Sequence, residues 1–130
     1  MMKVIIGKDC GNSPKNILIQ ELTIALTKGD LRSVLDRVTD DIRWNLVGDR
    51  LIRGKAPFIA ALQDKKNGKP VELILDHVAT HGRAGAVDGR IRFKNKNRQG
   101  FCHVYEFRTA KGDAIKEIIS YVIEIKEEPA

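Results

Sequence analysis

The sequence has few cysteines, few aromatic residues and no long hydrophobic run. Its 130 residues include two cysteines, Cys10 and Cys102, so we expect free thiols rather than a disulfide framework or a paired-cysteine metal site. Its apolar runs are short stretches such as Val4 to Ile6, far below the roughly 20 residues of a membrane span. We therefore expect no membrane partner. The N-terminus lacks the apolar core of a secretory signal, which predicts a cytoplasmic protein.

Charge does not identify a partner either. Lysine and arginine outnumber acidic residues by 23 to 17, and the resulting charge of +6 is spread along the chain. The densest basic cluster, 94–98, is interpreted as a solvated hairpin tip, because phosphate-backbone binding needs stacking aromatics interleaved with basic charge. We expect no nucleic-acid partner. The length predicts a single domain over 1–130, with 1–12 and 127–130 as loose termini.

Three helices are predicted in the first half of the chain. Ser13 and Pro14 favour a helix start, because serine caps exposed amides and proline at the first position loses no helical hydrogen bond. Gly29 ends this helix, and Asp30 caps a second one with a regular amphipathic pattern. The apolar positions are Leu31, Val34, Leu35 and Val38 in the second helix and Phe58, Ile59, Ala61 and Leu62 in a third, which Asn67, Gly68 and Pro70 terminate.

Strand periodicity begins at Asp41. Ile42, Trp44 and Leu46 alternate with other residues and form one face of a first strand. Four more strands are predicted over Val71 to His81, Ala84 to Lys94, Gln99 to Thr109 and Ala114 to Lys126. The breaks between them are short and rich in turn-forming residues, which indicates antiparallel hairpins.

This order of two helices, a strand, a third helix and an antiparallel meander resembles the nuclear transport factor 2-like superfamily. The phrases Gly29-Asp30-Leu31, Asp41-Ile42-Arg43-Trp44 and Ile52-Arg53-Gly54-Lys55 resemble its SnoaL-like branch. The resemblance covers nearly the whole chain from Ser13 to Ile125. It implies an α+β fold in which a curved antiparallel or mixed sheet wraps as a cone around three N-terminal helices and leaves a mostly apolar cavity. It also implies a homodimer.

The superfamily includes ketosteroid isomerase, whose reactive groups this chain does not reproduce. Matching the Gly29-Asp30-Leu31 phrase and Thr39-Asp40-Asp41 places the general base of that enzyme at Leu46 and its oxyanion tyrosine at Leu22. Neither leucine transfers a proton, so steroid isomerisation is not expected. The second oxyanion group of the isomerase falls at His103, a residue that can donate a hydrogen bond.

His103 is the main candidate for acid–base chemistry. Period two places it on one strand face with Phe101, Tyr105 and Phe107, and an unperturbed histidine pKa of about 6.5 suits general catalysis. The alternative is a core histidine that hydrogen-bonds a tyrosine or a carbonyl.

Two residues on neighbouring strands are candidates to assist His103. Asp88 and His77 are placed there by the strand pattern, and a carboxylate can orient an imidazole. The alternative is that Asp88, which shares its face with Arg90 and Arg92, belongs to a solvated, salt-bridged surface.

The candidate pocket lining is apolar and aromatic. Trp44, Leu46, Leu22, Phe101, Tyr105 and Phe107 are expected to line the cavity, or alternatively to fill it. No cofactor and no metal are expected, because no HExxH or CxxC motif is present. On the convex face, Cys102, Val104, Ile118 and Val122 are expected to form an apolar band for dimerisation.

Two functional hypotheses follow. In the first, the cavity binds a small apolar or aromatic molecule, with acid–base isomerase, dehydratase or hydrolase activity left open. In the second, the chain is a non-catalytic homodimeric interaction or structural domain.

Overall fold

The computed structural model describes residues 1–64 and 68–126. The expected helix-end signal at Asn67 and the expected loose tail at 127–130 lie outside this range. Among the described residues, no helix combines the length and the apolar character that a membrane crossing requires.

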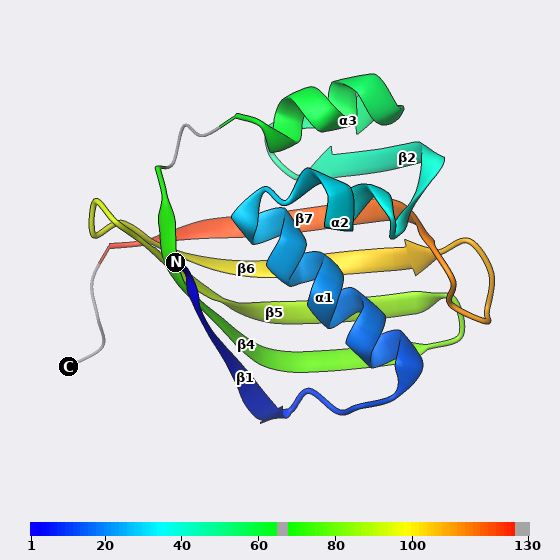
Figure 1. The fold of residues 1–130 in the computed structure, drawn as a ribbon, viewed down its shortest axis with the longest axis horizontal. Coiled ribbons are helices and arrows are strands. Elements are labelled where there is room, and N and C mark those ends of the chain that lie inside the picture. The colour runs from blue at the N-terminus through cyan, green and yellow to red at the C-terminus, as the bar shows by residue number, and fades with distance from the viewer. Residues whose placement is uncertain (65–67, 127–130) are drawn as a thin grey trace.

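Seven strands form one curved, open, mixed sheet (Figure 1). Their order across the sheet is β1-β4-β5-β6-β7-β2-β3. The β1/β4 and β2/β7 pairs are parallel, and the other pairs are antiparallel. The strands are β1 (Lys3–Asp9), β2 (Val38–Leu46), β3 (Arg50–Arg53), β4 (Pro70–His81), β5 (Ala84–Phe93), β6 (Arg98–Phe107) and β7 (Ile115–Ile125).

Three helices pack on the inner face of this sheet. They are α1 (Pro14–Lys28), α2 (Leu31–Leu35) and α3 (Lys55–Leu62). Helix α1 contacts β4 and β5, whereas α2 and α3 contact β2 (Figure 1). The α+β architecture with three helices on a curved mixed sheet confirms the predicted fold class.

Local capping explains where α1 and α2 begin. Ser13 Oγ accepts a hydrogen bond from the Asn16 amide at 3.2 Å, and Gly29 adopts the left-handed conformation that closes α1. Asp30 accepts from the Ser33 amide at 3.3 Å. The second helix is shorter than the pattern predicts, because Val38 belongs to β2 and pairs with Ile115.

The expectation of a loose segment over 1–12 is wrong for most of its length. Strand β1 pairs in parallel with β4, from Lys3 opposite Glu72 to Ile6 opposite Leu75. Cys10 follows this strand, is buried, and donates its thiol hydrogen to the Leu75 carbonyl at 3.6 Å. The short β1 sequence contains charged residues and glycine, so it carries no strong apolar alternation.

A β-bulge in β4 changes which side chains face the helices. Leu75 pairs with Gly89 and His77 pairs with Asp88, so Asp76 is an extra residue. Before the bulge, odd-numbered residues such as Leu75 point inward. After the bulge, Val78 points inward. Leu75 and Val78 are both buried. The side chain of His77 therefore lies on the outer face of the sheet.

The outer apolar band of β7 also differs from the prediction. Ile118 is buried on the inner face, opposite Tyr105, and Val122 pairs with Phe101 on that same face. Ile119, Tyr121 and Ile123 lie on the outer face instead, beside Cys102 and Val104 of β6.

We expect the close approach of β4 to β5 at the bulge to make Gly89 indispensable for stability. A Cβ at this position would lie 1.9 Å from the Ile74 carbonyl oxygen, so Gly89→Ala should lower the free energy of unfolding by about 3 kcal/mol or more. In Gly100→Ala the nearest atom would be 3.7 Å away, so this control should change stability by less than about 1 kcal/mol. Urea unfolding of both variants measures the difference; equal effects would contradict the prediction.

Candidate functional site

A cleft of about 400 Å³ opens on the inner face of the sheet, near the C-terminal end of α1 and beside α3. Trp44 and Leu46 of β2, Phe101 and His103 of β6, and Ser120 of β7 contribute to its walls. Among the described residues, the charged ones that line it are Asp49, Arg50 and Asp64, all of them exposed. The cleft therefore has an apolar and aromatic interior with charge at its exposed side.

Strand register positions the polar group at the base of this cleft. His103 pairs with Ser120 across β6 and β7, and Ser120 pairs with Leu46 across β7 and β2. His103 Nδ1 lies 2.7 Å from Ser120 Oγ, and Trp44 Nε1–H donates to the same oxygen at 2.8 Å. The three side chains form one connected hydrogen-bonded group.

His103 is held in its neutral form. It is 7% exposed, and burial lowers its pKa from 6.5 to about 4 because removal from water disfavours the charged ring. Its ring centre lies 4.8 Å from that of Phe101, with the planes tilted by 31°. At neutral pH the cleft therefore contains an uncharged imidazole beside an aromatic ring.

Trp44 forms a fixed wall of the cleft. Its ring meets Phe58 of α3 edge-to-face, with ring centres 5.4 Å apart and an interplanar angle of 65°, an arrangement that favours aromatic pairs. Phe58 is fully buried. This contact and the Ser120 hydrogen bond together orient the indole.

Three of the predicted lining residues belong to the core instead. Leu22, Tyr105 and Phe107 are fully buried, and the cleft lining does not include them. The Tyr105 hydroxyl is 2.7 Å from Thr23 Oγ1, which itself donates to the Ile19 carbonyl at 2.7 Å. Burial raises the pKa of Tyr105, so its hydroxyl stays protonated within this internal hydrogen-bonded chain.

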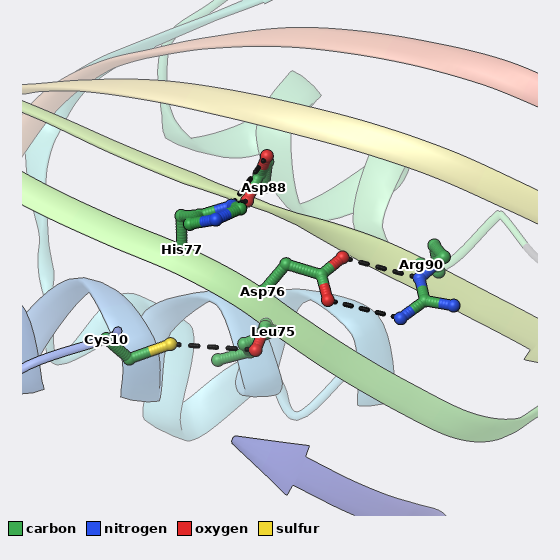
Figure 2. A network of polar contacts seen from close by, with 6 residues as sticks. All are labelled: Cys10, Leu75, Asp76, His77, Asp88 and Arg90. Atoms are coloured by element: carbon green, nitrogen blue, oxygen red, sulfur yellow. Dashed lines mark hydrogen bonds and ion pairs between the residues drawn. The ribbon is translucent and has the colours of Figure 1, made fainter. Parts of the chain in front are cut away.

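The predicted grouping of His77, Asp88 and His103 is not formed. His77 Nδ1 and Asp88 Oδ1 are 2.9 Å apart, with side chains 67% and 45% exposed on the outer face, whereas His103 points inward. Figure 2 shows this pair next to the Asp76–Arg90 ion pair, which is 3.1 Å long. The β4 bulge reverses the side on which His77 lies, and Asp88 belongs to a solvated, salt-bridged surface.

Sequence reasoning missed Ser120, which connects Trp44 to His103. A serine within the apolar run of β7 is a signal that could have pointed to it, since a buried hydroxyl needs hydrogen-bond partners. In the described part of the chain, no group of three or more histidine, cysteine, aspartate or glutamate side chains is arranged to hold a metal ion.

Comparison with solved structures identifies the architecture. An NTF2-like protein of unknown function from Cytophaga hutchinsonii superposes with a TM-score of 0.66 at 25% identity, over 82% of this chain and 97% of that chain. A second NTF2-like protein, from Burkholderia xenovorans, gives 0.71 at 18% identity, over 88% and 87%. The chain has the nuclear transport factor 2-like fold. No family model and no curated protein matches the sequence.

Another structural neighbour is described as an enzyme. SalBIII, described as an epoxide hydrolase/cyclase-like enzyme with a role in pyran ring formation in the polyether salinomycin, gives a TM-score of 0.68 at 15% identity. The match covers 84% of this chain and 90% of that chain. At this identity the likeness extends to the fold.

The neutral state of His103 predicts a pH-dependent stability. Folded His103 takes up a proton near pH 4, whereas an unfolded histidine does so near 6.5, so the unfolded state binds more protons between these values. Stability should therefore fall as pH decreases from about 6.5 to about 4, by on the order of 3 kcal/mol.

His103→Phe removes this titration and is the matched control. Urea unfolding at several pH values should show that the free energy of unfolding of wild type decreases relative to that of the variant as pH falls through this window. A difference that stays constant with pH would contradict the assignment of a neutral His103.

Proposed function

We propose that the NTF2-like cleft binds a small, mostly apolar or aromatic molecule. The observation that carries this proposal is that a space of about 400 Å³, lined in part by Trp44 and His103, remains open, although the neighbouring core is filled by Leu22, Tyr105 and Phe107. Small-molecule sites typically have volumes of roughly 300–1,000 Å³, with apolar walls and a few polar groups. The cleft matches this description in size, and apolar and aromatic side chains line it together with polar and charged ones.

The proposal concerns binding first. Catalysis by acid–base chemistry would need a second titratable group beside His103, and its hydrogen-bond partner among the described residues is Ser120. The carboxylates that line the cleft, Asp49 and Asp64, are exposed. The fold shared with SalBIII supports a cleft able to accept an organic ligand, without carrying over the reaction of that enzyme.

Filling the cleft should weaken ligand binding. Ala61 lies on α3 and lines the cleft, whereas the adjacent Ala60 is exposed and does not line it. Ala61→Phe should weaken the binding of 2-naphthol, used as a probe, roughly ten-fold or more because the added ring occupies the ligand space. Ala60→Phe should leave binding unchanged.

Trp44 provides the readout for this test. It is the single tryptophan of the chain, so one indole N–H signal in a proton–nitrogen correlation spectrum reports on the cleft. That signal should shift when the probe is added to wild type. Binding that is lost equally in both phenylalanine variants, or that leaves the Trp44 signal in place, would place the ligand elsewhere.

We also propose that the chain forms a homodimer through the outer face of β6 and β7. Tyr121 and Ile123 are 48% and 72% exposed and lie beside Cys102, Val104 and Ile119. Exposed apolar patches of this kind mark association sites. Paired about a two-fold axis, the patch would cover itself in a second copy.

A charge in this patch should separate the subunits. Light scattering at micromolar concentration should give twice the 14.6 kDa chain mass for wild type and the chain mass for Ile123→Glu, since a buried unpaired carboxylate opposes association. Ile6→Glu, at an equally apolar exposed position on the distant strand β1, should remain dimeric. A monomeric wild type would refute the dimer.

A further inference from the structure

One nitrogen in the cleft is free to bind a ligand. His103 Nδ1 contacts Ser120, whereas no hydrogen bond from the described residues reaches Nε2. Within that same part of the chain, no buried side-chain nitrogen or oxygen lacks a partner. Because Nε2 has no such partner, it is not one of the buried atoms. It is therefore accessible from the cleft that His103 lines.

The hydrogen-bonded group assigns the proton on each ring nitrogen. An indole N–H is a donor only, so Ser120 Oγ must accept from Trp44. Ser120 is 2% exposed as a residue, and the other contact of its hydroxyl among the described residues is with His103 Nδ1. The hydroxyl proton of Ser120 is satisfied when the hydroxyl donates to Nδ1. Nδ1 then accepts this hydrogen bond and carries no proton of its own. In a neutral imidazole the proton is consequently on Nε2.

The opposite tautomer would leave a buried donor unsatisfied. If Nδ1–H donated to Ser120 Oγ, this oxygen would accept two hydrogen bonds while its own proton had no acceptor among the described residues. Buried donors without acceptors are unfavourable. The arrangement in which Trp44 donates to Ser120 and Ser120 donates to His103 satisfies the indole N–H, the hydroxyl and Nδ1, and leaves Nε2–H for a partner in the cleft.

We propose that Ser120, held by Trp44, fixes His103 in the Nε2–H tautomer, so that the cleft selects ligands that present a hydrogen-bond acceptor. This inference rests on the proposed function. Planar ketones, esters and ethers have the required chemistry, because an aromatic or conjugated body fits beside Phe101 and Trp44 and an oxygen accepts from Nε2–H. Ser120 is a positioning residue, since it acts through His103.

The surroundings of His103 support this selection. Burial keeps its ring neutral at pH 7, and a hydrogen bond in an apolar cleft is electrostatically stronger than the same bond in water. The charged residues lining the cleft, Asp49, Arg50 and Asp64, are exposed. An uncharged acceptor therefore meets a donor without having to neutralise a buried charge.

The first experiment reads the tautomer directly. Long-range proton–nitrogen correlation spectra of uniformly nitrogen-15-labelled protein at pH 7 should show His103 with Nε2 protonated and Nδ1 bare. Trp44→Phe frees Ser120 to accept from Nδ1–H, and Ser120→Ala removes the hydroxyl, so both variants should move the ring signals towards a mixture of tautomers. Ser120→Thr keeps the hydroxyl and should restore the wild-type pattern.

The second experiment measures selection with two probes of nearly identical shape. 2-Acetylnaphthalene carries a ketone oxygen where 2-isopropenylnaphthalene carries a methylene group. Wild type should bind the ketone roughly three- to ten-fold more tightly, the expected effect of one net hydrogen bond. His103→Phe keeps an aromatic ring but no donor, so the two probes should bind it equally.

Each outcome decides between the claims. A protonated Nδ1 in wild type overturns the inference whatever the probes do. Equal binding of both probes to wild type, with Nε2 protonated, also overturns it, while the proposed binding function stands. If neither probe binds, the proposed function fails together with the ligand preference, and the tautomer spectrum separately tests the role of Ser120.

Discussion

The alternation of side chains across β4 to β7 governs which residues of this protein meet in the cleft. Successive residues of a strand point to opposite faces, so one inserted residue exchanges the faces for all that follow. The bulge at Asp76 does this in β4 and moves His77 to the solvated side. The uninterrupted pairing of His103 with Ser120 keeps both on the side of the helices. The composition of the site thus follows from register.

Burial then decides what the cleft can do chemically. A histidine removed from water loses its charged form, so His103 enters the cleft as a neutral hydrogen-bonding group rather than as a cation or an acid. The hydroxyl of Ser120 contacts one nitrogen of its ring, and the indole of Trp44 donates to that hydroxyl. The proposed Nε2–H donor then lies beside the aromatic part of the cleft lining, which favours orientation of a ligand over transfer of a proton.

Local sequence signals were enough to predict the fold, whereas the residues that meet in the site depend on long-range strand register. Ser13, Gly29 and Asp30 mark helix ends through interactions a few residues apart, which is why α1 and the start of α2 were predictable. The faces of β7 were not, because Ile118 and Ile119 are equally apolar and periodicity fits either phase. The bulge had one visible sign, Gly89, whose missing Cβ admits the Ile74 carbonyl; glycine inside a strand often accompanies such irregularities.

The two faces of the sheet have different environments, and this separates their functions. On the outer face, His77 and Asp88 are exposed and contact each other, so they shape no cavity. On the inner face, His103 is uncharged and is hydrogen-bonded to the Ser120 hydroxyl, to which the Trp44 indole also donates. The proposed ligand site therefore belongs to the inner face, where aromatic walls and the proposed Nε2–H donor coincide, while exposed apolar residues of β7 make the outer face suited to association.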